Sequence, residues 1–529
     1  MHEKVLELAR RRLFLHQPRR VLDLLRTPGA GSLGIGIPES WNEGIRTFYD
    51  LLQNGVAGRR CNGTACSYAR GELGAARPGA AGVAAPDAGA AAALAASGRS
   101  RVRCLGRCFE GPADEAAAAH YIPRRSLTAT PIVLRQLLGA VLDPWADYEL
   151  PDGAAILAAV EAWGLRGRGG AAYPTAAKWK VARDTPAADR IVVANGDEGD
   201  PGAFVDRLLL EDAPHSVLAG MLACARAIGA GRGIVYVRAE YPVAAERVRA
   251  AIAEAHERGV LHGFDVTVLV GAGSYVAGEE TALLRSIEGL RAEPMPKPPY
   301  PAVRGLCGLP TIVQNVETLS IVPCIARAIL PSPARTSVAS AALDDRGNPG
   351  RTADEVAGSG HRFGFAPRID TKAVCLSGAV ARPGVVEVDL GTPLRRVLEQ
   401  GGGGPPAGKR WKMALVGGPL GRVVAAENFD VPLSFDALPG MGHAGIVVFD
   451  DSVHARALAE HLFEFARSES CGTCAPCRIG TSQLAACRTR EALERLLTTI
   501  GDGSLCGFGQ GVPQPIRDML AAFGDEVLA

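Results

Sequence analysis

Residues 190–204 read RIVVANGDEGDPGAF, a short apolar run that ends in a dense group of acidic and glycine residues. Two similar apolar runs follow, GIVYV at 233–237 and FDVTVLVGAG at 264–273, and a helical pattern follows each of them. Short β-rich runs that alternate with helices are typical of α/β folds with a parallel sheet. The middle of the chain is therefore predicted to be an α/β domain.

The regions on either side of this domain have different patterns. Residues 370–445 contain the short strand patterns AVCLSGAV, GVVEVDL and MALVGG and a helical pattern, TPLRRVLEQ, which together indicate a compact α+β module. Residues after 445 have apolar positions at helical spacing around a group of cysteines, which indicates a small helical domain with a metal site. Residues 1–55 contain two helical patterns, and an Ala-, Gly- and Pro-rich segment follows between Cys66 and Cys104.

Length and composition exclude several classes of protein. A chain of 529 residues suggests two to four domains at about 150 residues each, and 47% hydrophobic with 21% charged residues excludes wholesale disorder. The net charge of +1, without a long block of one sign, does not favour a nucleic-acid partner. There is no secretory apolar region near residue 1 and no stretch of about 18 apolar residues, so we expect a cytoplasmic protein without direct membrane insertion.

Four cysteines near the C-terminus have the spacing of an iron-sulfur site. Cys471, Cys474 and Cys477 form a C-x2-C-x2-C motif, and Cys506 follows after 28 residues. Three thiolates with this spacing can hold one face of a [4Fe-4S] cubane, and a remote fourth completes the ligand set. Zinc is the alternative, but four-cysteine zinc sites normally bring two C-x2-C pairs. The pattern favours a [4Fe-4S] cluster.

Four further cysteines form two pairs nearer the N-terminus. Cys61 and Cys66 are separated by four residues, and Cys104 and Cys108 by three. Two pairs suit the two irons of a [2Fe-2S] centre, and the neighbouring glycines leave backbone N–H groups available to the sulfurs. The alternatives are zinc and a relic fold without metal, because the Ala-rich insert between the pairs is poor core material.

A glycine-rich segment, GLRGRGGAAYPTAAKW at 164–179, has the composition of an anion-binding loop. Clustered glycines let backbone amides approach an anion, and Arg168 and Lys178 add positive charge. The spacing matches neither the dinucleotide nor the Walker fingerprint, so a plain glycine-rich turn is equally compatible with it.

Polar side chains also gather after the expected strands. Asn195, Asp197, Glu198 and Asp200 suit the amide and hydroxyl donors of a flavin or a ribose, although a solvated acidic turn has the same composition. Glu279 and Glu280 open a helix, where the helix dipole alone is a sufficient reason for acidic residues. A proline-rich segment holds Lys297 and Tyr300, and Tyr173 and Tyr300 are candidate stacking surfaces for an adenine or simple packing residues.

These motifs occur in one order that resembles the NADH-binding flavoprotein family. This family comprises the FMN-containing subunit of respiratory complex I and its relatives in NAD-linked hydrogenases and formate dehydrogenases. The resemblance covers residues 130–529 through GLRGRGGAAYPTAAKW, NGDEGDPGAF, GAGSYVAGEETAL, PPYPAVRGL, QNVETL and ESCGTCAPCRIG. Residues 40–120 resemble, more weakly, the thioredoxin-like [2Fe-2S] subunit, which is often fused to the flavoprotein in the hydrogenase relatives.

The resemblance implies an α/β multidomain fold with four parts. They are a helical segment plus thioredoxin-like [2Fe-2S] domain at 1–125, a Rossmann-like FMN/NADH domain at 126–335, a ubiquitin-like SLBB α+β domain at 336–445 and a C-terminal helical bundle with the [4Fe-4S] cluster at 446–529. Its FMN-binding residues would be Gly167, Arg168, Gly169, Gly170, Lys178, Asn195, Asp197, Glu198, Tyr275, Gly278, Asn315 and Thr318. Its NADH-facing residues would be Tyr173, Asp200, Glu279, Glu280, Lys297 and Tyr300, with Asp200 in place of the family's usual Glu.

The resemblance also implies the activity of an NADH:acceptor oxidoreductase, or diaphorase. NAD(H) exchanges two electrons as hydride whereas an iron-sulfur centre accepts one, so FMN would stand between them and other subunits of a multisubunit redox complex would exchange the single electrons. No general base is nominated, because the protein's contribution would be orientation and redox tuning. The alternative is a non-catalytic iron-sulfur scaffold whose nucleotide site has decayed.

Overall fold

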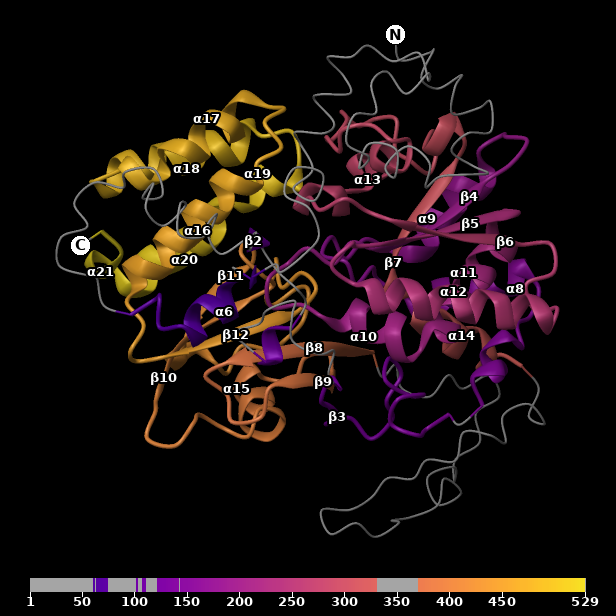
Figure 1. Ribbon diagram of the computed structural model, residues 1–529, viewed down its shortest axis with the longest axis horizontal. Coiled ribbons are helices and arrows are strands. Elements are labelled where there is room, and N and C mark those ends of the chain that lie inside the picture. Colours follow the sequence, from indigo (N-terminus) through magenta and orange to yellow (C-terminus); the bar gives the residue numbers. More distant parts are fainter. Residues whose placement is uncertain are drawn as a thin grey trace.

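The computed structural model describes residues 60–61, 63–74, 101–102, 107–110, 121–141, 143–330 and 370–528. The helical patterns expected within residues 1–55 and the Ala-rich segment between Cys66 and Cys104 lie outside the described residues. Figure 1 shows a parallel sheet with its helices, a second sheet beside it and a group of C-terminal helices.

The first sheet is the expected α/β domain. Its strands are β4 (Ile191–Gly196), β5 (Arg232–Val237), β6 (Asp265–Val270) and β7 (Thr311–Asn315), all parallel, in the order β6-β5-β4-β7. The first four residues of β4 are completely buried, as expected for a parallel sheet that is covered on both faces. The three apolar runs in the sequence therefore correspond to β4, β5 and β6.

Seven helices accompany this sheet: α8 (Gly153–Trp163), α9 (Thr175–Asp184), α10 (Val205–Asp212), α11 (Pro214–Ile228), α12 (Pro242–Glu257), α13 (Glu280–Ile287) and α14 (Val316–Arg327). The closest helix packing is between α11 and α14. A Cβ atom at Gly220 would lie 2.0 Å from the Leu319 carbonyl oxygen, so only glycine allows this approach. α14 therefore packs closely against α11, and its N-terminus lies at the end of β7.

The second sheet is the expected α+β module. It has the order β11-β10-β12-β8-β9-β3, with β8 (Thr371–Gly378), β9 (Gly384–Asp389), β10 (Trp411–Val416), β11 (Arg422–Ala425) and β12 (Gly445–Asp450). The helical pattern at 392–400 becomes a short α-turn, α15 (Leu394–Arg396), followed by a π-helical turn, η7 (Val397–Gly401). The edge strand β3 (Arg124–Ser126) comes from before the flavoprotein-like region and pairs in parallel with β9.

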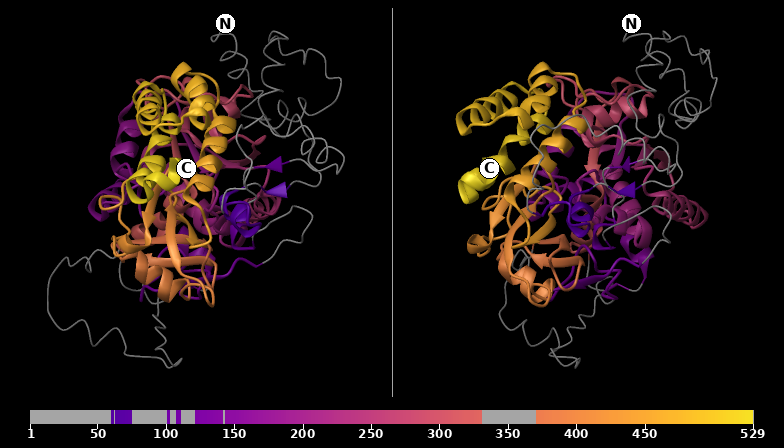
Figure 2. Two further views of the ribbon diagram at one scale, coloured as in Figure 1. Left: turned by 90° about the vertical axis from the view of Figure 1, so that its left-hand side faces the viewer. Right: turned by 60° about the vertical axis from the view of Figure 1, so that its left-hand side comes forward.

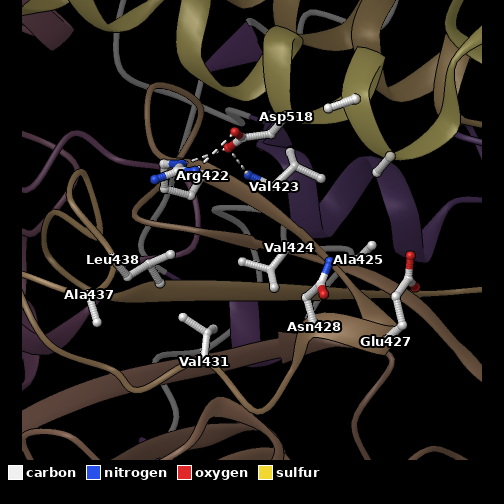
Figure 3. Close-up of a pocket in the computed structure, with 12 residues that line it drawn as sticks. Arg422, Val423, Val424, Ala425, Glu427, Asn428, Val431, Ala437, Leu438 and Asp518 are labelled. Carbon is white, nitrogen blue, oxygen red and sulfur yellow. Dashed lines mark hydrogen bonds and ion pairs between the residues drawn. The ribbon is translucent and has the colours of Figure 1, made fainter.

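The C-terminal region is helical, as expected. It contains α16 (Ala455–Glu469), α17 (Ala475–Gln483), α18 (Arg490–Gly503), α19 (Gly507–Gly511), α20 (Pro513–Phe523) and α21 (Asp525–Leu528). A pocket of about 440 Å³ lies between β11 and α20 (Figure 3), where Asp518 accepts hydrogen bonds from the Arg422 side chain and the Val423 backbone. This contact fixes the helices on the second sheet.

Two of the described N-terminal pieces, the helix at Thr64–Ala69 and the turn at Cys108–Glu110, pack against the same second sheet (Figure 2). β1 (Arg60–Cys61) pairs in parallel with β2 (Arg101–Val102), and α6 (Thr64–Ala69) contacts β8 and β12. The Tyr68 hydroxyl donates to Asp450 at 3.1 Å. Most of the expected thioredoxin-like domain lies outside the described residues.

Short 3₁₀ turns complete the architecture at η1 (Cys108–Glu110), η2 (Pro144–Tyr148), η3 (Tyr275–Gly278), η4 (Leu306–Gly308), η8 (Ala426–Asn428) and η9 (Leu484–Ala486). Within the described ranges, no single helix has the length and apolar character needed to cross a bilayer. The bent pair α10 and α11 passes that test only when both helices are counted together across a 98° bend.

Candidate active site

The candidate site begins where β4 and β7 end. Asn195 and Asn315 are register partners at the carboxyl ends of these adjacent strands, which is where open α/β sheets bind ligands. The Asn195 amide donates to the Gly278 carbonyl oxygen at 2.9 Å, and Asn315 caps α14 by accepting from the Thr318 N–H at 3.2 Å. Three motifs that are distant in sequence therefore meet at one sheet edge.

The glycine-rich loop closes over the start of α14. The Arg168 N–H donates to the Thr318 hydroxyl at 2.8 Å, and the Gly167 N–H donates to the Tyr173 carbonyl at 2.9 Å. A Cβ at Gly169 would lie 3.0 Å from the Asn315 Cβ, and Gly170 has a φ of +119°. Glycine is needed at both positions, one for the close approach and the other for its backbone conformation.

The Arg168 side chain has the properties expected of an anion ligand. It is 0% exposed, and its guanidinium forms an ion pair with Asp370 and lies 5.6 Å from the centre of the Phe435 ring. Its Nε and Nη1 groups have no hydrogen-bond partner. Buried charged donors without partners are costly, so a phosphate group beside this loop would fit them.

Asp197 is a second buried polar group without a full set of partners. Burial raises the pKa of Asp197 to about 8, although Arg238 opposes this shift. Its Oδ2 atom has no hydrogen-bond partner, and a Cβ at Gly278 would lie 3.4 Å from it. A protonated Asp197 can donate a hydrogen bond to a ligand acceptor in the space that Gly278 leaves open.

Glu198 is placed by the fold beneath α10. Its carboxylate accepts hydrogen bonds from the Val205, Asp206 and Arg207 N–H groups at 2.8, 3.1 and 3.1 Å. Asp206 in turn accepts from the Asn315 amide at 2.6 Å. Glu198 therefore stabilises α10, and Asp206 of this helix orients Asn315. Glu198 thus acts on the site indirectly, through α10.

Asp200 and Tyr275 connect the site to the C-terminal helices. The Tyr275 hydroxyl donates to Asp200 at 2.5 Å, and burial together with Asp200 raises the pKa of the Tyr275 phenol. The Tyr275 ring packs edge-on against Phe465 and Phe508 at centroid distances of 5.2 and 5.6 Å. Phe508 is two residues from Cys506, so this aromatic group joins the strand-end site to the cysteine region.

The candidate dinucleotide residues lie at a more open part of the site. Glu279 caps α13 by accepting from the Thr281 and Ala282 N–H groups at 2.9 and 3.0 Å, and it also pairs with Lys297 at 2.7 Å. Glu280 forms an ion pair with Lys178, whose Nζ also donates to the Val313 carbonyl at 2.7 Å. Tyr173 and Tyr300 are 56% and 58% exposed, as suits side chains available for stacking.

The four C-terminal cysteines lie at neighbouring helix starts. Cys474 caps α17 and Cys506 caps α19. Burial raises the pKa of the Cys477 thiol to about 11, and the thiols of the other three cysteines contribute to this shift.

The N-terminal pairs are described only in part. Cys66 and Cys108 are 0% and 4% exposed. Cys104 and the side chain of Cys61 lie outside the described residues, so the [2Fe-2S] ligand set stays a prediction.

Sequence reasoning missed several residues that shape the site, namely His443, Asp206, Lys372 and Glu317. The Lys372 ammonium, from the second sheet, donates to Glu317 at 2.5 Å and to the His443 carbonyl at 3.1 Å. Glu317 also accepts from the Ala373 N–H at 3.2 Å. The QNVETL motif contained Glu317, but no signal in the sequence linked Lys372 or His443 to it.

Comparisons with known families agree with this arrangement. A family model described as the Nuo51 FMN-binding domain matches residues 160–324, one for the NADH-ubiquinone oxidoreductase-F iron-sulfur binding region matches 457–529, and one for the SLBB domain matches 373–424. These matches confirm the FMN-binding, [4Fe-4S] and SLBB parts of the expected fold.

Individual relatives give the same result. The chain is 39% identical to the NADP-reducing hydrogenase subunit HndC of Solidesulfovibrio fructosivorans, over 70% of this chain and 75% of that protein. It is 38% identical to an NADH-quinone oxidoreductase subunit of Rhizobium meliloti, over 69% of this chain and 86% of that protein. A crystal structure of air-oxidised NAD⁺-reducing [NiFe]-hydrogenase matches with a TM-score of 0.73 and 29% identity, over 99% of this chain and 92% of that one. The chain belongs to the family of NADH-dependent flavin oxidoreductase subunits that includes these NADH-quinone oxidoreductase and hydrogenase proteins.

Proposed function

We propose that this chain is the electron-entry subunit of a larger redox complex, where it exchanges electrons between NAD(H) and a partner subunit. Bound FMN would supply the conversion between two-electron hydride transfer and one-electron transfer. The observation that supports this most directly is the meeting of the glycine loop and the ends of β4 and β7 around buried polar atoms without partners. Leaving these atoms without partners costs free energy in the protein without cofactor. A bound flavin would supply the missing hydrogen-bond partners.

We define the flavin side of the site as the residues that would hold FMN. The Arg168 guanidinium and the loop amides would bind the phosphate, Asn195 and Asp197 would offer hydrogen bonds to the ring, and Asn315 and Thr318 would place the start of α14 beneath it. The complete set is Gly167, Arg168, Gly169, Gly170, Lys178, Asn195, Asp197, Glu198, Tyr275, Gly278, Asn315 and Thr318.

The dinucleotide side is the more open set opposite it: Tyr173, Asp200, Glu279, Glu280, Lys297 and Tyr300. The two exposed tyrosines would stack on the adenine, and Glu279 would accept hydrogen bonds from the ribose hydroxyls. HndC is named for NADP, whereas other relatives are named for NADH. We propose NADH for this chain, because Glu279 and Glu280 would repel a 2′-phosphate at that ribose.

Single electrons would leave through the Cys471, Cys474, Cys477 and Cys506 cluster. The Tyr275, Phe465 and Phe508 contacts join the flavin side to the helix that Cys506 caps. Domain limits of 1–125, 126–335, 336–445 and 446–529 remain our proposal, with β3 as a strand that crosses the first of them. The [2Fe-2S] centre of Cys61, Cys66, Cys104 and Cys108 would be a side branch or a further step of the electron path.

The partner we propose is a catalytic-metal subunit of the hydrogenase or formate dehydrogenase type. The solved hydrogenase chain aligns over 99% of this chain, whereas the sequence match to the Rhizobium meliloti protein covers 69% of it. This supports a complex in which the [2Fe-2S] module is fused to the flavoprotein.

The proposal is tested by purifying the full chain without oxygen and counting FMN, iron and acid-labile sulfide. We expect one FMN, with about six irons for two clusters or about four if the N-terminal pairs carry none, and bleaching of the flavin on addition of NADH. A chain that binds iron but neither binds FMN nor responds to NADH would be the scaffold instead. Zinc in place of iron would overturn the electron path.

A further inference from the structure

His443 reaches the flavin side from the second sheet. It lies two residues before the start of β12, yet its Nε2 atom lies 3.5 Å from where a Cβ of Gly169 would be. Gly442 lies against the same loop, 3.9 Å from the equivalent position at Gly170. The His443 side chain is only 16% exposed. The second sheet therefore contributes an imidazole to a site otherwise built by the first domain.

Three carboxylates surround this imidazole. Its Nδ1 atom lies 3.8 Å from the Asp200 Oδ2 atom and has no hydrogen-bond partner. One oxygen of Glu198 and one of Asp206 lie within 4.8 Å of a ring nitrogen and of each other. Burial raises the pKa of Glu198, and His443 is the largest influence that opposes this shift. The histidine thus acts electrostatically on acids from both the loop and α10.

The nearby cation is already engaged. Lys372 on β8 is buried and pairs with Glu317 of α14 at 2.5 Å, and it touches His443 only through the backbone carbonyl at 3.1 Å. Arg168, on the glycine loop, pairs with Asp370. Among these groups, His443 is therefore the basic side chain that remains for Asp200.

A metal ion does not explain this cluster. The Glu198 oxygens accept three backbone N–H groups, and the Asp206 oxygens accept the Asn315 amide and the Glu317 N–H. A cation would have to compete with the caps of two helices for these oxygens. The side chain that remains open to His443 is Asp200.

We propose that His443 is a positioning residue that fixes Asp200 for the dinucleotide. This rests on the proposed function, in which Asp200 faces NADH. The Tyr275 hydroxyl donates to the Oδ1 atom of Asp200, and the imidazole Nδ1 atom lies 3.8 Å from the Oδ2 atom, within reach of an ion pair.

The test compares His443→Gln with the wild-type chain. FMN content, and kcat and KM for NADH with ferricyanide as acceptor, are measured for each. We expect full FMN content, a kcat within about twofold, and a KM about fivefold higher than that of the wild type. Adding His443→Gln to Asp200→Asn should change KM no further.

His454→Gln is the matched control. The Nδ1 atom of His454 also lacks a hydrogen bond and lies 3.9 Å from a carboxylate, that of Glu526, but among the C-terminal helices. His454→Gln should have the same FMN content, kcat and KM as the wild-type chain. An unchanged KM in His443→Gln, a fall in kcat equal to the rise in KM, or loss of FMN from that variant would overturn the inference. A wild-type chain without FMN would instead reject the proposed function.

Discussion

The flavin side and the dinucleotide side of the site differ most in burial and in how their charges are satisfied. On the flavin side, Arg168 and Thr318 are 0% exposed and two polar groups lack partners. On the dinucleotide side, the tyrosines are more than half exposed and Glu279 and Glu280 already have cationic partners. A resident cofactor fits the first arrangement and a substrate that must leave fits the second. Changes on the flavin side should therefore affect folding and cofactor retention, and changes on the other side only nucleotide use.

The largest effect is expected from Lys372→Met, which removes the buried cation beneath the flavin side. Lys372 and Glu317 are completely buried, and the loss of one partner of such a pair costs about 3–5 kcal/mol. Glu317 lies between Asn315 and Thr318 in sequence, so FMN retention should fall as well. Denaturant unfolding and flavin content measure the two effects.

Lys412→Met is the control for that change. Lys412 forms an equally close pair with Glu526, but both side chains are partly exposed, and such pairs contribute at most about 1 kcal/mol. Equal destabilisation in the two variants would mean that the Lys372 network has no special role in holding the two sheets together.

A smaller change in stability, with a defined pH dependence, is expected from Asp197→Asn. The pKa of Asp197 is about 8 in the folded chain against an ordinary 3.8, so the folded state holds a proton that the unfolded state releases. The stabilisation is complete below about pH 4 and is lost as the pH rises towards 8. Relative to wild type, the flavin-free variant should therefore gain about 3.5 kcal/mol between pH 5 and pH 8.

Denaturant unfolding of both chains at several pH values measures this difference. Asp189→Asn is the control, since Asp189 is half-buried, pairs with Arg232 and lies at the opposite end of β4. If the wild-type and Asp197→Asn curves run parallel, Asp197 does not carry the proton.

Arg168→Lys tests whether the partnerless guanidinium groups serve the cofactor. Lysine keeps the charge but not the Nε and Nη1 donors, and a hydrogen bond to a charged group contributes about 1.5–3 kcal/mol, so FMN affinity should fall about 20-fold. Titration of the flavin-free chain with FMN by fluorescence measures the loss. Arg166→Lys, at a residue whose partner Asp436 is exposed, should bind FMN as the wild type does.

Much of this difference between the two sides could be predicted from the sequence. What could not be predicted has a physical reason. The apolar runs predicted β4, β5 and β6 because strand burial leaves a local pattern. Asn195 and Asn315 are grouped only through the family resemblance, because the sequence pattern predicts no strand before Asn315. His443 and Lys372 could not be placed at the site from the sequence, because their partners come from another domain. These contacts depend on how the two sheets pack. Glu198 carried a functional expectation, and the structure shows that its oxygens also cap α10.

The smallest effect is expected on the dinucleotide side, from Glu279→Gln. The glutamine can still accept the helix-capping hydrogen bonds from Thr281 and Ala282, but it no longer neutralises Lys297, which becomes available to a 2′-phosphate. The ratio of kcat/KM for NADPH to that for NADH should rise about fivefold, with FMN content and stability unchanged. Glu161→Gln, at an exposed ion pair with Lys180, should leave the ratio as it is. Loss of FMN from Glu279→Gln would contradict the comparison itself, because a residue on the open side would then be holding the resident cofactor.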